Sequence, residues 1–335
     1  MKKRTFDFRA LLYTFSLFLF FTAILLYATV LPMNIQHTSA DATVVSQENL
    51  YSDVLFLSTL NPPRSYNNLD SLNKAADYIE GVFKTNCKNT EVQKYSVERT
   101  EYKNIICRFS GSSKSRIVVG AHYDVAGEKP GADDNASGVA GLLELVRLTK
   151  AQASELPFDL EFVAYTLEEP PYFRTENMGS AIHAQSLKDA KVQLKLMMSL
   201  EMIGYYSEKK NSQFYPVPLI NMIYPSEGNF IGVVGKITQA PTVYEVKQKM
   251  LEGSHIDVRS FSPVNIIPGL DFSDHLNYWN RGYKAVMITD TAFYRNDAYH
   301  TEADSIERLN FEKMAQVVQA VFWTITHLDS GQSEL

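Results

Sequence analysis

The sequence contains few cysteines, few tryptophans and no long basic segment beyond its first residues. Of 335 residues, two are cysteine and two are tryptophan, so at most one intrachain disulfide can form. Acidic residues outnumber basic ones by 38 to 32, which gives a formal net charge of −6. The chain also lacks internal repeats and low-complexity tracts. These absences argue against a disulfide-stapled scaffold, a repeat protein and a nucleic-acid-binding protein.

The two cysteines are Cys87 and Cys107. We expect Cys87 at the end of a helix and Cys107 on a strand, so the two could meet. A bridge that closes this loop would contribute about 3 kcal/mol to stability. Two buried free thiols fit the sequence equally well, and neither cysteine is placed like a catalytic nucleophile.

The N-terminal segment differs from the rest because it is apolar and follows a cluster of positive charge. No charged residue occurs between positions 10 and 31. This length exceeds the roughly 7–15 residues of a signal-peptide core and matches the roughly 20 of a membrane-spanning helix. The basic residues before it are Lys2, Lys3, Arg4 and Arg9. We therefore expect residues 1–40 to anchor an exported protein in the membrane; the alternative is secretion after cleavage near Thr38-Ser39-Ala40.

Strand and helix patterns alternate along the remainder of the chain. Apolar runs typical of strands buried on both faces occur at 116–124, 160–167, 195–204, 230–235 and 284–291. Apolar residues at helical spacing occur at 70–85, 136–151, 177–190, 242–251 and 310–327. Segments 91–98 and 102–109 alternate like paired strands. This order predicts an α/β domain whose mixed, mostly parallel sheet lies between helices and binds ligands at the carboxyl ends of its strands.

Chemically reactive side chains gather after the first buried run. His122 and Asp124 end this strand and point to the same face, so the carboxylate can hold the imidazole ring. The loop GADDNASG, residues 131–138, follows, and its flanking glycines let the backbone bend closely around a bound group. A helix cap would need one acid here, not Asp133 and Asp134 in succession. We therefore expect a divalent cation beside at least one of them.

Further acids and a second histidine follow later strands. Glu168 and Glu169 end the second buried run, where one can bind a metal and the other can take a proton from water. Glu201 interrupts an apolar segment, where an unpaired carboxylate would be costly. His300 lies in the segment YHTEAD after the last of these runs.

The combined set of two histidines and three acids offers the nitrogen and oxygen ligands that suit zinc. A catalytic zinc normally takes three protein ligands and a water, so five ligands exceed the needs of one ion. A carboxylate that bridges two ions, about 3.5–4 Å apart, accounts for the number. We therefore predict two zinc ions per chain. The candidate ligands are His122, one acid of the pair Asp133-Asp134, one acid of the pair Glu168-Glu169, Glu201 and His300.

These motifs in this order resemble the co-catalytic zinc aminopeptidase family, the family of bacterial leucyl aminopeptidase, aminopeptidase Y and glutamate carboxypeptidase II. The matching segments are HYD, GADDNASG, EE, the acid before MIG, FSDH and TDTAFYRNDAYHTEAD. The resemblance implies one catalytic domain over residues 41–330. It also implies a three-layer α/β sandwich with about eight strands.

The resemblance assigns the metal ligands to two sites. Asp134 would bridge the two zinc ions. His122 and Glu201 would complete one site, and Glu169 and His300 would complete the other. Glu201 is a departure, because the best-known members more often have aspartate there, and the extra methylene could change metal spacing or preference.

The resemblance also implies supporting roles around the ligands. Glu168 would be the general base that deprotonates water, and Asp124 would support His122 from behind. Asp274, in the segment FSDH, would support the substrate or the ligands.

The implied function is zinc-dependent hydrolysis of N-terminal residues from peptides. One alternative is a single-zinc transferase like glutaminyl cyclase. Another is a di-zinc carboxypeptidase, in which Arg174 could bind the terminal carboxylate of the substrate. A non-catalytic binding domain fits less well, because the chain keeps the complete ligand set and the base. The expected partners are a peptide substrate and, through the N-terminal segment, a membrane.

Overall fold

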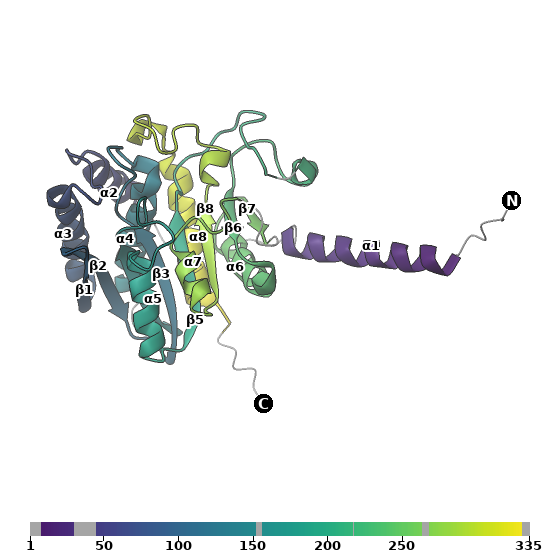
Figure 1. The fold of residues 1–335 in the computed structure, drawn as a ribbon, viewed down its shortest axis with the longest axis horizontal. Coiled ribbons are helices and arrows are strands. Elements are labelled where there is room, and N and C mark those ends of the chain that lie inside the picture. Colours follow the sequence, from purple (N-terminus) through teal and green to yellow (C-terminus); the bar gives the residue numbers. More distant parts are fainter. Residues whose placement is uncertain (1–7, 30–44, 152–155, 217, 263–267, 330–335) are drawn as a thin grey trace.

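An eight-stranded sheet forms the centre of the computed structural model, with the strand order β1-β2-β4-β3-β5-β8-β6-β7 (Figure 1). The structure describes residues 8–29, 45–151, 156–216, 218–262 and 268–329. The strands are β1 (Asn89–Val97), β2 (Thr100–Phe109), β3 (Ser113–His122), β4 (Phe158–Tyr165), β5 (Leu194–Glu201), β6 (Ile231–Val234), β7 (Val258–Phe261) and β8 (Ala285–Thr289).

Helices cover both faces of the sheet, which confirms the predicted three-layer α/β sandwich (Figure 1). One apolar core contains α2 (Gln47–Ser58), α3 (Leu69–Asn86), α4 (Gly138–Ala151), α6 (Ala240–Gly253) and α8 (Phe311–His327). The core on the other face contains α5 (Gly179–Asp189) and α7 (His275–Asn280).

Strand β3 shows how the sequence produces two cores. Ile117 and Val119 belong to the core that contains α4, whereas Val118, between them, belongs to the core that contains α5. Neighbouring side chains of a strand point to opposite faces, so a strand buried on both faces must be apolar at every position. The continuous apolar run in the sequence therefore correctly predicted a central strand.

The pairing of the strands determines which chain segments meet at one edge of the sheet. β3 pairs in parallel with both β4 and β5, and β5 pairs in parallel with β8. The pairs β1–β2, β2–β4 and β6–β8 are antiparallel, so the sheet is mixed. Because β3, β4, β5 and β8 run in the same direction, the chain segments that leave their carboxyl ends meet at a single edge.

The cysteines form a disulfide between the end of α3 and strand β2. Cys87 and Cys107 are 20 residues apart in sequence, and their Cα atoms lie 5.9 Å apart. Both side chains are buried in the core beneath α3. The structure thus selects the bridged alternative over two free thiols.

Two short elements escaped prediction from sequence. β7 has four residues and α7 has six. Neither is long enough for apolar residues to recur at a recognisable spacing. The loop GADDNASG also differs from expectation, because α4 begins at Gly138 and a kinked, irregular turn, Ala132–Ser137, precedes it. That turn presents the acidic residues to the site.

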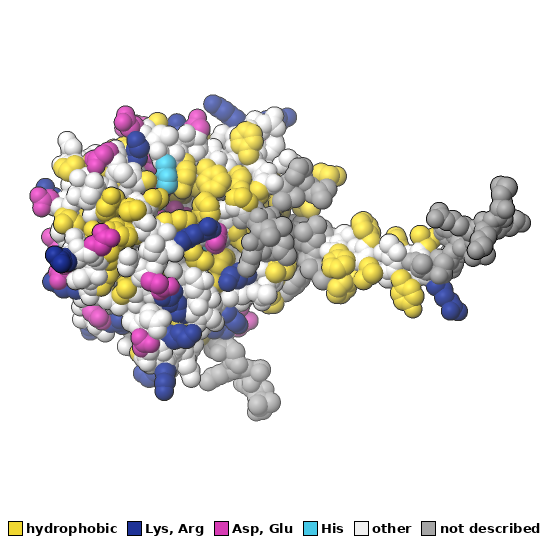
Figure 2. Space-filling view, viewed as in Figure 1, with side chains coloured by type: hydrophobic (Ala, Val, Ile, Leu, Met, Phe, Trp, Pro, Cys, Tyr) yellow, Lys and Arg dark blue, Asp and Glu magenta, His cyan; other side chains and the backbone are white. Residues whose placement is uncertain are grey.

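Helix α1 (Phe8–Thr29) extends away from the body of the molecule (Figure 1). Exposed apolar side chains are spread along its described part (Figure 2). Within the described residues, no helix reaches the combined length and apolar character of a membrane span. The possible cleavage site at Thr38-Ser39-Ala40 lies outside the described residues.

Candidate active site

The five predicted ligands converge at the carboxyl edge of the parallel strands. His122 is the last residue of β3, and Glu201 is the last residue of β5. Glu169 follows the end of β4, and His300 follows β8. Asp134 comes from the irregular turn between β3 and α4. The topology thus gathers residues that lie up to 178 positions apart in the sequence (300 − 122).

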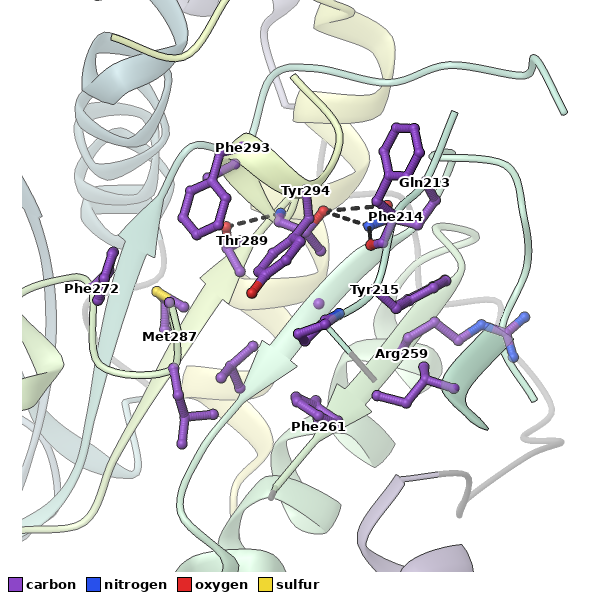
Figure 3. Close-up of a pocket in the computed structure, with 18 of the residues that line it drawn as sticks. Gln213, Phe214, Tyr215, Arg259, Phe261, Phe272, Met287, Thr289, Phe293 and Tyr294 are labelled. Carbon is purple, nitrogen blue, oxygen red and sulfur yellow. Dashed lines mark hydrogen bonds between the residues drawn. The ribbon is translucent and has the colours of Figure 1, made fainter. Parts of the chain in front are cut away.

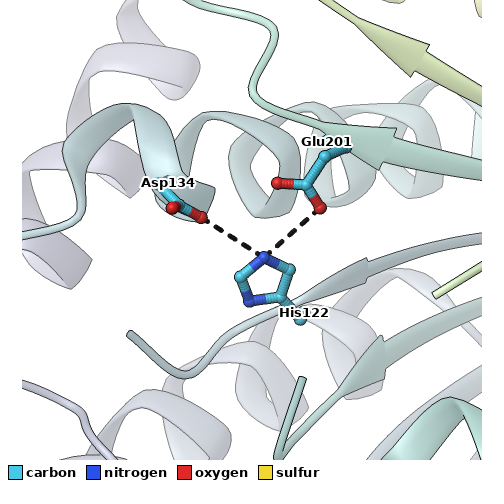
Figure 4. Close-up of side chains that lie close together, drawn as sticks. All are labelled: His122, Asp134 and Glu201. Atoms are coloured by element: carbon cyan, nitrogen blue, oxygen red, sulfur yellow. Dashed lines mark ion pairs between the residues drawn. The ribbon is translucent and has the colours of Figure 1, made fainter. Parts of the chain in front are cut away.

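His122, Asp134 and Glu201 form the first group of ligand atoms (Figure 4). The Nε2 atom of His122 lies 3.4 Å from Oδ1 of Asp134 and 3.4 Å from Oε2 of Glu201. All three side chains are buried. In Figure 4 the two carboxylates reach toward the same imidazole nitrogen from different elements.

Asp134 also belongs to a second group, with Glu169 and His300. Its Oδ2 atom lies 3.0 Å from Nε2 of His300, and that nitrogen lies 3.3 Å from Oε2 of Glu169. Within each group the ligand atoms lie within 4.8 Å of one another. One carboxylate therefore faces both groups, one through each oxygen, which is an arrangement suited to a bridging ligand.

The donor set fits metal binding better than an ordinary hydrogen-bond network. Among the described residues, the buried atoms Nε2 of His122 and Oε1 of Glu169 have no hydrogen-bond partner. Buried polar atoms without a partner lower the stability of the fold, so in native proteins nearly all of them bind a hydrogen-bond partner, a water or an ion. Imidazole nitrogen and carboxylate oxygen are the ligands that zinc binds. The residues present therefore fit zinc.

Crowding of carboxylates shifts several pKa values at the site. Burial, reinforced by Glu169 and Glu201, raises the pKa of Glu168 well above its usual value. Burial and the neighbouring Asp134 raise the pKa of Glu169 to about 7. Burial alone would lower the pKa of His300, but hydrogen bonds with Asp134 and Glu169 raise it to about 10. So many acids in a small buried volume require compensating positive charge, which divalent cations supply.

Glu168 lies beside the two groups that share Asp134. Its Oε2 atom is 3.9 Å from Nε2 of His122, and its side chain is buried. Glu168 also forms a third group of potential ligand atoms, with His122 and Glu169. The two groups that share Asp134 are complete without it, so the geometry places Glu168 within reach of both a bound metal and a water at the site.

Asp124 contacts both His122 and the segment after β4. Its carboxylate accepts the backbone N–H of Glu168 at 3.2 Å and that of Glu169 at 3.1 Å. The Nδ1 atom of His122 lies 3.2 Å from the backbone carbonyl oxygen of Asp124 but 3.7 Å from its carboxylate. The carbonyl thus orients the ring, while the carboxylate fixes the segment after β4.

The loop acid Asp133, which had no expected role, anchors the loop to two other segments. Its carboxylate accepts the backbone N–H of Gly204 at 3.0 Å and the side-chain amide of Asn296 at 2.8 Å. The loop's adjacent acids thus have separate tasks: Asp133 makes internal hydrogen bonds, and Asp134 faces the ligand groups.

Sequence reasoning missed three residues that support the ligands. Ser273 donates to Oε2 of Glu201 at 2.7 Å, and a second hydroxyl, on Ser199, lies 2.7 Å from Ser273. Arg64 and Asp304 hold the loop that carries Asp134. Ser273 stands next to Asp274 in the segment FSDH, and Asp304 ends the segment YHTEAD, so both lie within motifs already identified. No pattern in the sequence singles out Arg64.

Asp274 and Arg174 occupy contrasting places. Asp274 is fully buried, and burial, with Glu201 and Asp124 nearby, raises its pKa to about 7. Arg174 is half exposed, and its guanidinium lies 2.5 Å from a carboxylate oxygen of Asp271. It also lies over the ring of Phe272, 5.1 Å from the ring centre. Asp274 therefore lies near the ligands, whereas Arg174 does not line the apolar cavity beside Glu201.

An apolar cavity opens beside Glu201 and encloses about 840 Å³, part of it open to solvent. Strands β6, β7 and β8 supply wall residues such as Val234, Phe261 and Met287, and surrounding loops add aromatic rings (Figure 3). Polar groups in the lining are engaged with one another: Gln213 donates to Thr291 at 2.9 Å. The cavity therefore offers a largely apolar surface, rich in aromatic rings, next to the ligand groups.

Comparison with known proteins connects this site to a family. The profile of Peptidase family M28 matches residues 104–325. The uncharacterized protein YfbL of Escherichia coli is 44% identical, and the alignment covers 90% of this chain and 96% of that protein. A probable leucine aminopeptidase of Arthroderma otae is 27% identical, with 87% and 75% covered.

Solved structures share the fold at lower identity. LapA of Legionella pneumophila superposes with a TM-score of 0.68 at 19% identity, over 87% of this chain and 76% of that one. A glutaminyl cyclase of Porphyromonas gingivalis superposes with a TM-score of 0.64 at 18% identity, over 85% and 99%. The match to the family profile, over most of the chain, is the decisive one: this protein belongs to peptidase family M28.

Proposed function

We propose that this protein is an aminopeptidase that uses two zinc ions bridged by Asp134. The observation that carries the proposal is the position of the Asp134 carboxylate, which presents one oxygen to His122 and the other to His300. Glu201 would complete the first zinc site, and Glu169 would complete the second. Bound zinc supplies Lewis acidity, which lowers the pKa of water and polarises a peptide carbonyl.

The remaining chemistry belongs to the chain's own residues. Glu168 is not required as a ligand and lies 3.9 Å from His122, so its Oε2 can accept a proton from the attacking water. The same oxygen can then return the proton to the departing amine. Asp124 fixes the backbone of Glu168 and keeps the base in place during both transfers.

The cavity beside Glu201 supports a preference for large apolar N-terminal residues. Its lining is aromatic and aliphatic, with charged side chains confined to Glu201 and Arg259 among the described residues. Arg259 is paired with Asp257 at 2.6 Å. A basic substrate side chain would lose its hydration without finding a free acid, whereas leucine or phenylalanine would bury apolar surface. The leucine aminopeptidases among the relatives agree with this preference.

The two alternative activities have less support from the site. A carboxypeptidase needs a cation free to bind the terminal carboxylate of the substrate, and Arg174 is engaged with Asp271 instead. A glutaminyl cyclase shares the fold but, as a single-zinc enzyme, would not need a carboxylate that faces two ligand groups.

A panel of aminoacyl-nitroanilides tests the proposal, with and without a chelator. We expect hydrolysis of the leucine and phenylalanine substrates, its loss on chelation and its return when zinc is added. Cyclisation of an N-terminal glutamine substrate without nitroaniline release would overturn the assignment in favour of the transferase. Release of C-terminal residues from blocked peptides would favour the carboxypeptidase.

We also propose that residues 1–40 direct export of the catalytic domain, here assigned to residues 41–330, and attach it to the membrane. The charge-free stretch at 10–31 and the disulfide between Cys87 and Cys107 support export, because disulfides persist in oxidising compartments. Protease treatment of intact cells tests this topology. Digestion of the domain only after lysis would contradict export, and full recovery in the soluble fraction would contradict attachment.

A further inference from the structure

Arg64 is a buried cation whose hydrogen bonds all go to backbone carbonyl groups. Its side chain is fully buried, and no described carboxylate lies within ion-pair distance. Nε donates to the carbonyl of Tyr123 at 2.8 Å, and Nη2 donates to Gly131 at 2.7 Å. Nη1 donates to Leu57 at 3.0 Å and to Pro130 at 2.7 Å. A buried cation without a direct ion pair is costly, and the charges of nearby carboxylates offset part of that cost.

The carbonyl groups that Arg64 binds belong to the segments that carry metal ligands. Tyr123 directly follows His122, and Gly131 lies three positions before Asp134. One planar guanidinium thus ties the end of β3 to the acidic loop. Leu57, in the last turn of α2, adds an attachment to the helical layer.

Asp304 binds the same loop through its backbone amide groups. Its Oδ1 accepts the backbone N–H of Asp133 at 2.9 Å, and its Oδ2 accepts that of Asp134 at 3.0 Å. The carbonyl groups at the start of the loop therefore face a cation, and the amide groups that follow face a carboxyl group, whose pKa burial and Asp133 raise to about 7. Hydrogen bonds to charged groups are roughly twice as strong as neutral ones. Burial lowers the pKa of Arg64 to about 10, which leaves it charged at neutral pH.

We propose that Arg64 is a positioning residue for the metal centre, and that with Asp304 it clamps the acidic loop so that Asp134 is already placed before metal binds. This inference rests on the proposed role of Asp134 as the bridging ligand. A loop fixed in advance loses less conformational entropy when metal binds, and this raises metal affinity. Residues that orient metal ligands typically change metal affinity by about 10–100-fold when replaced.

Zinc titration of the metal-free full-length chain against a competing chelator tests the inference. We expect Arg64→Lys, which keeps the charge but cannot reach four carbonyl groups, to bind zinc about 10-fold more weakly or worse. We expect Asp304→Asn to show a similar loss of zinc affinity, because the side-chain amide of asparagine would place an N–H group against a backbone N–H. Both variants should also alter the visible absorption spectrum of the cobalt-substituted protein.

Arg147→Gln is the matched control. Arg147 is a partly buried arginine that contacts α2 through Asp53 at 2.7 and 3.0 Å, and it makes no contact with the acidic loop. We expect this control to lower the unfolding temperature without changing zinc affinity or the cobalt spectrum. Equal losses of affinity in the control and in the clamp variants would show a general stability effect and overturn the inference.

The outcomes separate this inference from the proposed function. A wild-type chain that binds fewer than two zinc ions overturns both. A wild-type chain that binds two, with clamp variants of unchanged affinity and spectrum, overturns the role of Arg64 alone. If Arg64→Lys does not fold, Asp304→Asn decides by the same criteria, because Asp304 binds the amide groups of the loop and not its carbonyl groups.

Discussion

The carboxylate of Asp124 accepts the backbone N–H of Glu168 at 3.2 Å, and thereby joins the segment after β3 to the segment after β4. Its other oxygen accepts the N–H of Glu169 at 3.1 Å. A single buried side chain thus fixes the proposed base and one proposed ligand. Asp124 therefore sets the position of Glu168, the proposed proton-transfer group, through a backbone hydrogen bond.

Replacement of Asp124 by asparagine should therefore damage catalysis more than folding. The amide NH2 group would face a backbone N–H, so the Glu168–Glu169 segment should shift. We expect kcat to fall about 10–100-fold, with a smaller change in KM. Steady-state kinetics with leucine nitroanilide measure this, and unchanged kcat would contradict the positioning role.

The variant Glu168→Gln should keep its zinc and lose its turnover. Glutamine preserves the size of the side chain but cannot accept the proton from water. General-base removal typically costs about 10²–10⁴-fold in rate, so we expect kcat to fall within that range. The matched control is Glu169→Gln, the neighbouring acid, which should lose zinc as well as activity. Full turnover in the Glu168 variant would rule out its role as base.

The variant Val234→Phe should narrow substrate choice. Val234 lies on β6 and lines the apolar cavity, so a phenyl ring there should occupy space meant for the substrate side chain. We expect kcat/KM for leucine and phenylalanine nitroanilides to fall about 10-fold or more. Hydrolysis of the alanine substrate serves as the internal control and should change little. An equal loss for all three would place substrate binding elsewhere.

Acid should destabilise the fold through His275. This side chain is fully buried, donates through Nε2 to the carbonyl of Leu270 at 2.9 Å, and burial lowers its pKa to about 4. A depressed histidine pKa means that the unfolded chain binds the proton more readily. The stabilisation is present above about pH 6.5 and is lost as the pH falls toward 4.

Between pH 7 and pH 4, His275 should lower the free energy of unfolding by about 3 kcal/mol. Urea unfolding across this range measures it, with His275→Gln as the comparison because glutamine keeps a donor but does not titrate. The wild-type free energy of unfolding should fall more steeply with acid than that of the variant. Parallel pH profiles would show that His275 does not carry the effect.

Much of the architecture follows from local patterns in the sequence. The run from Ile117 to His122 is apolar and then ends in a polar residue, which marks both a central strand and the edge where ligands bind. The spacing of apolar residues likewise predicted α3 and α8, because each buries one long face.

The supporting residues could not be predicted in the same way, because their partners are backbone groups distant in sequence. Arg64 contacts Gly131, 67 positions away, and Asp304 contacts Asp134, 170 positions away. Neither contact produces a periodic pattern or a recognisable spacing within one segment of the sequence. The additional role of Asp124 has the same origin, since its carboxylate accepts hydrogen bonds from backbone amides of the segment after β4.

The zinc content of the purified protein tests the central claim most directly. Plasma emission spectroscopy on wild-type chain and on Asp134→Ala, both equilibrated with zinc and freed of excess metal, gives the number of ions per chain. The shared position of Asp134 predicts two zinc ions in the wild type and loss of both in the variant, because one substitution removes a ligand from each site. One zinc in the wild type, or two retained in the variant, would contradict a centre bridged by Asp134.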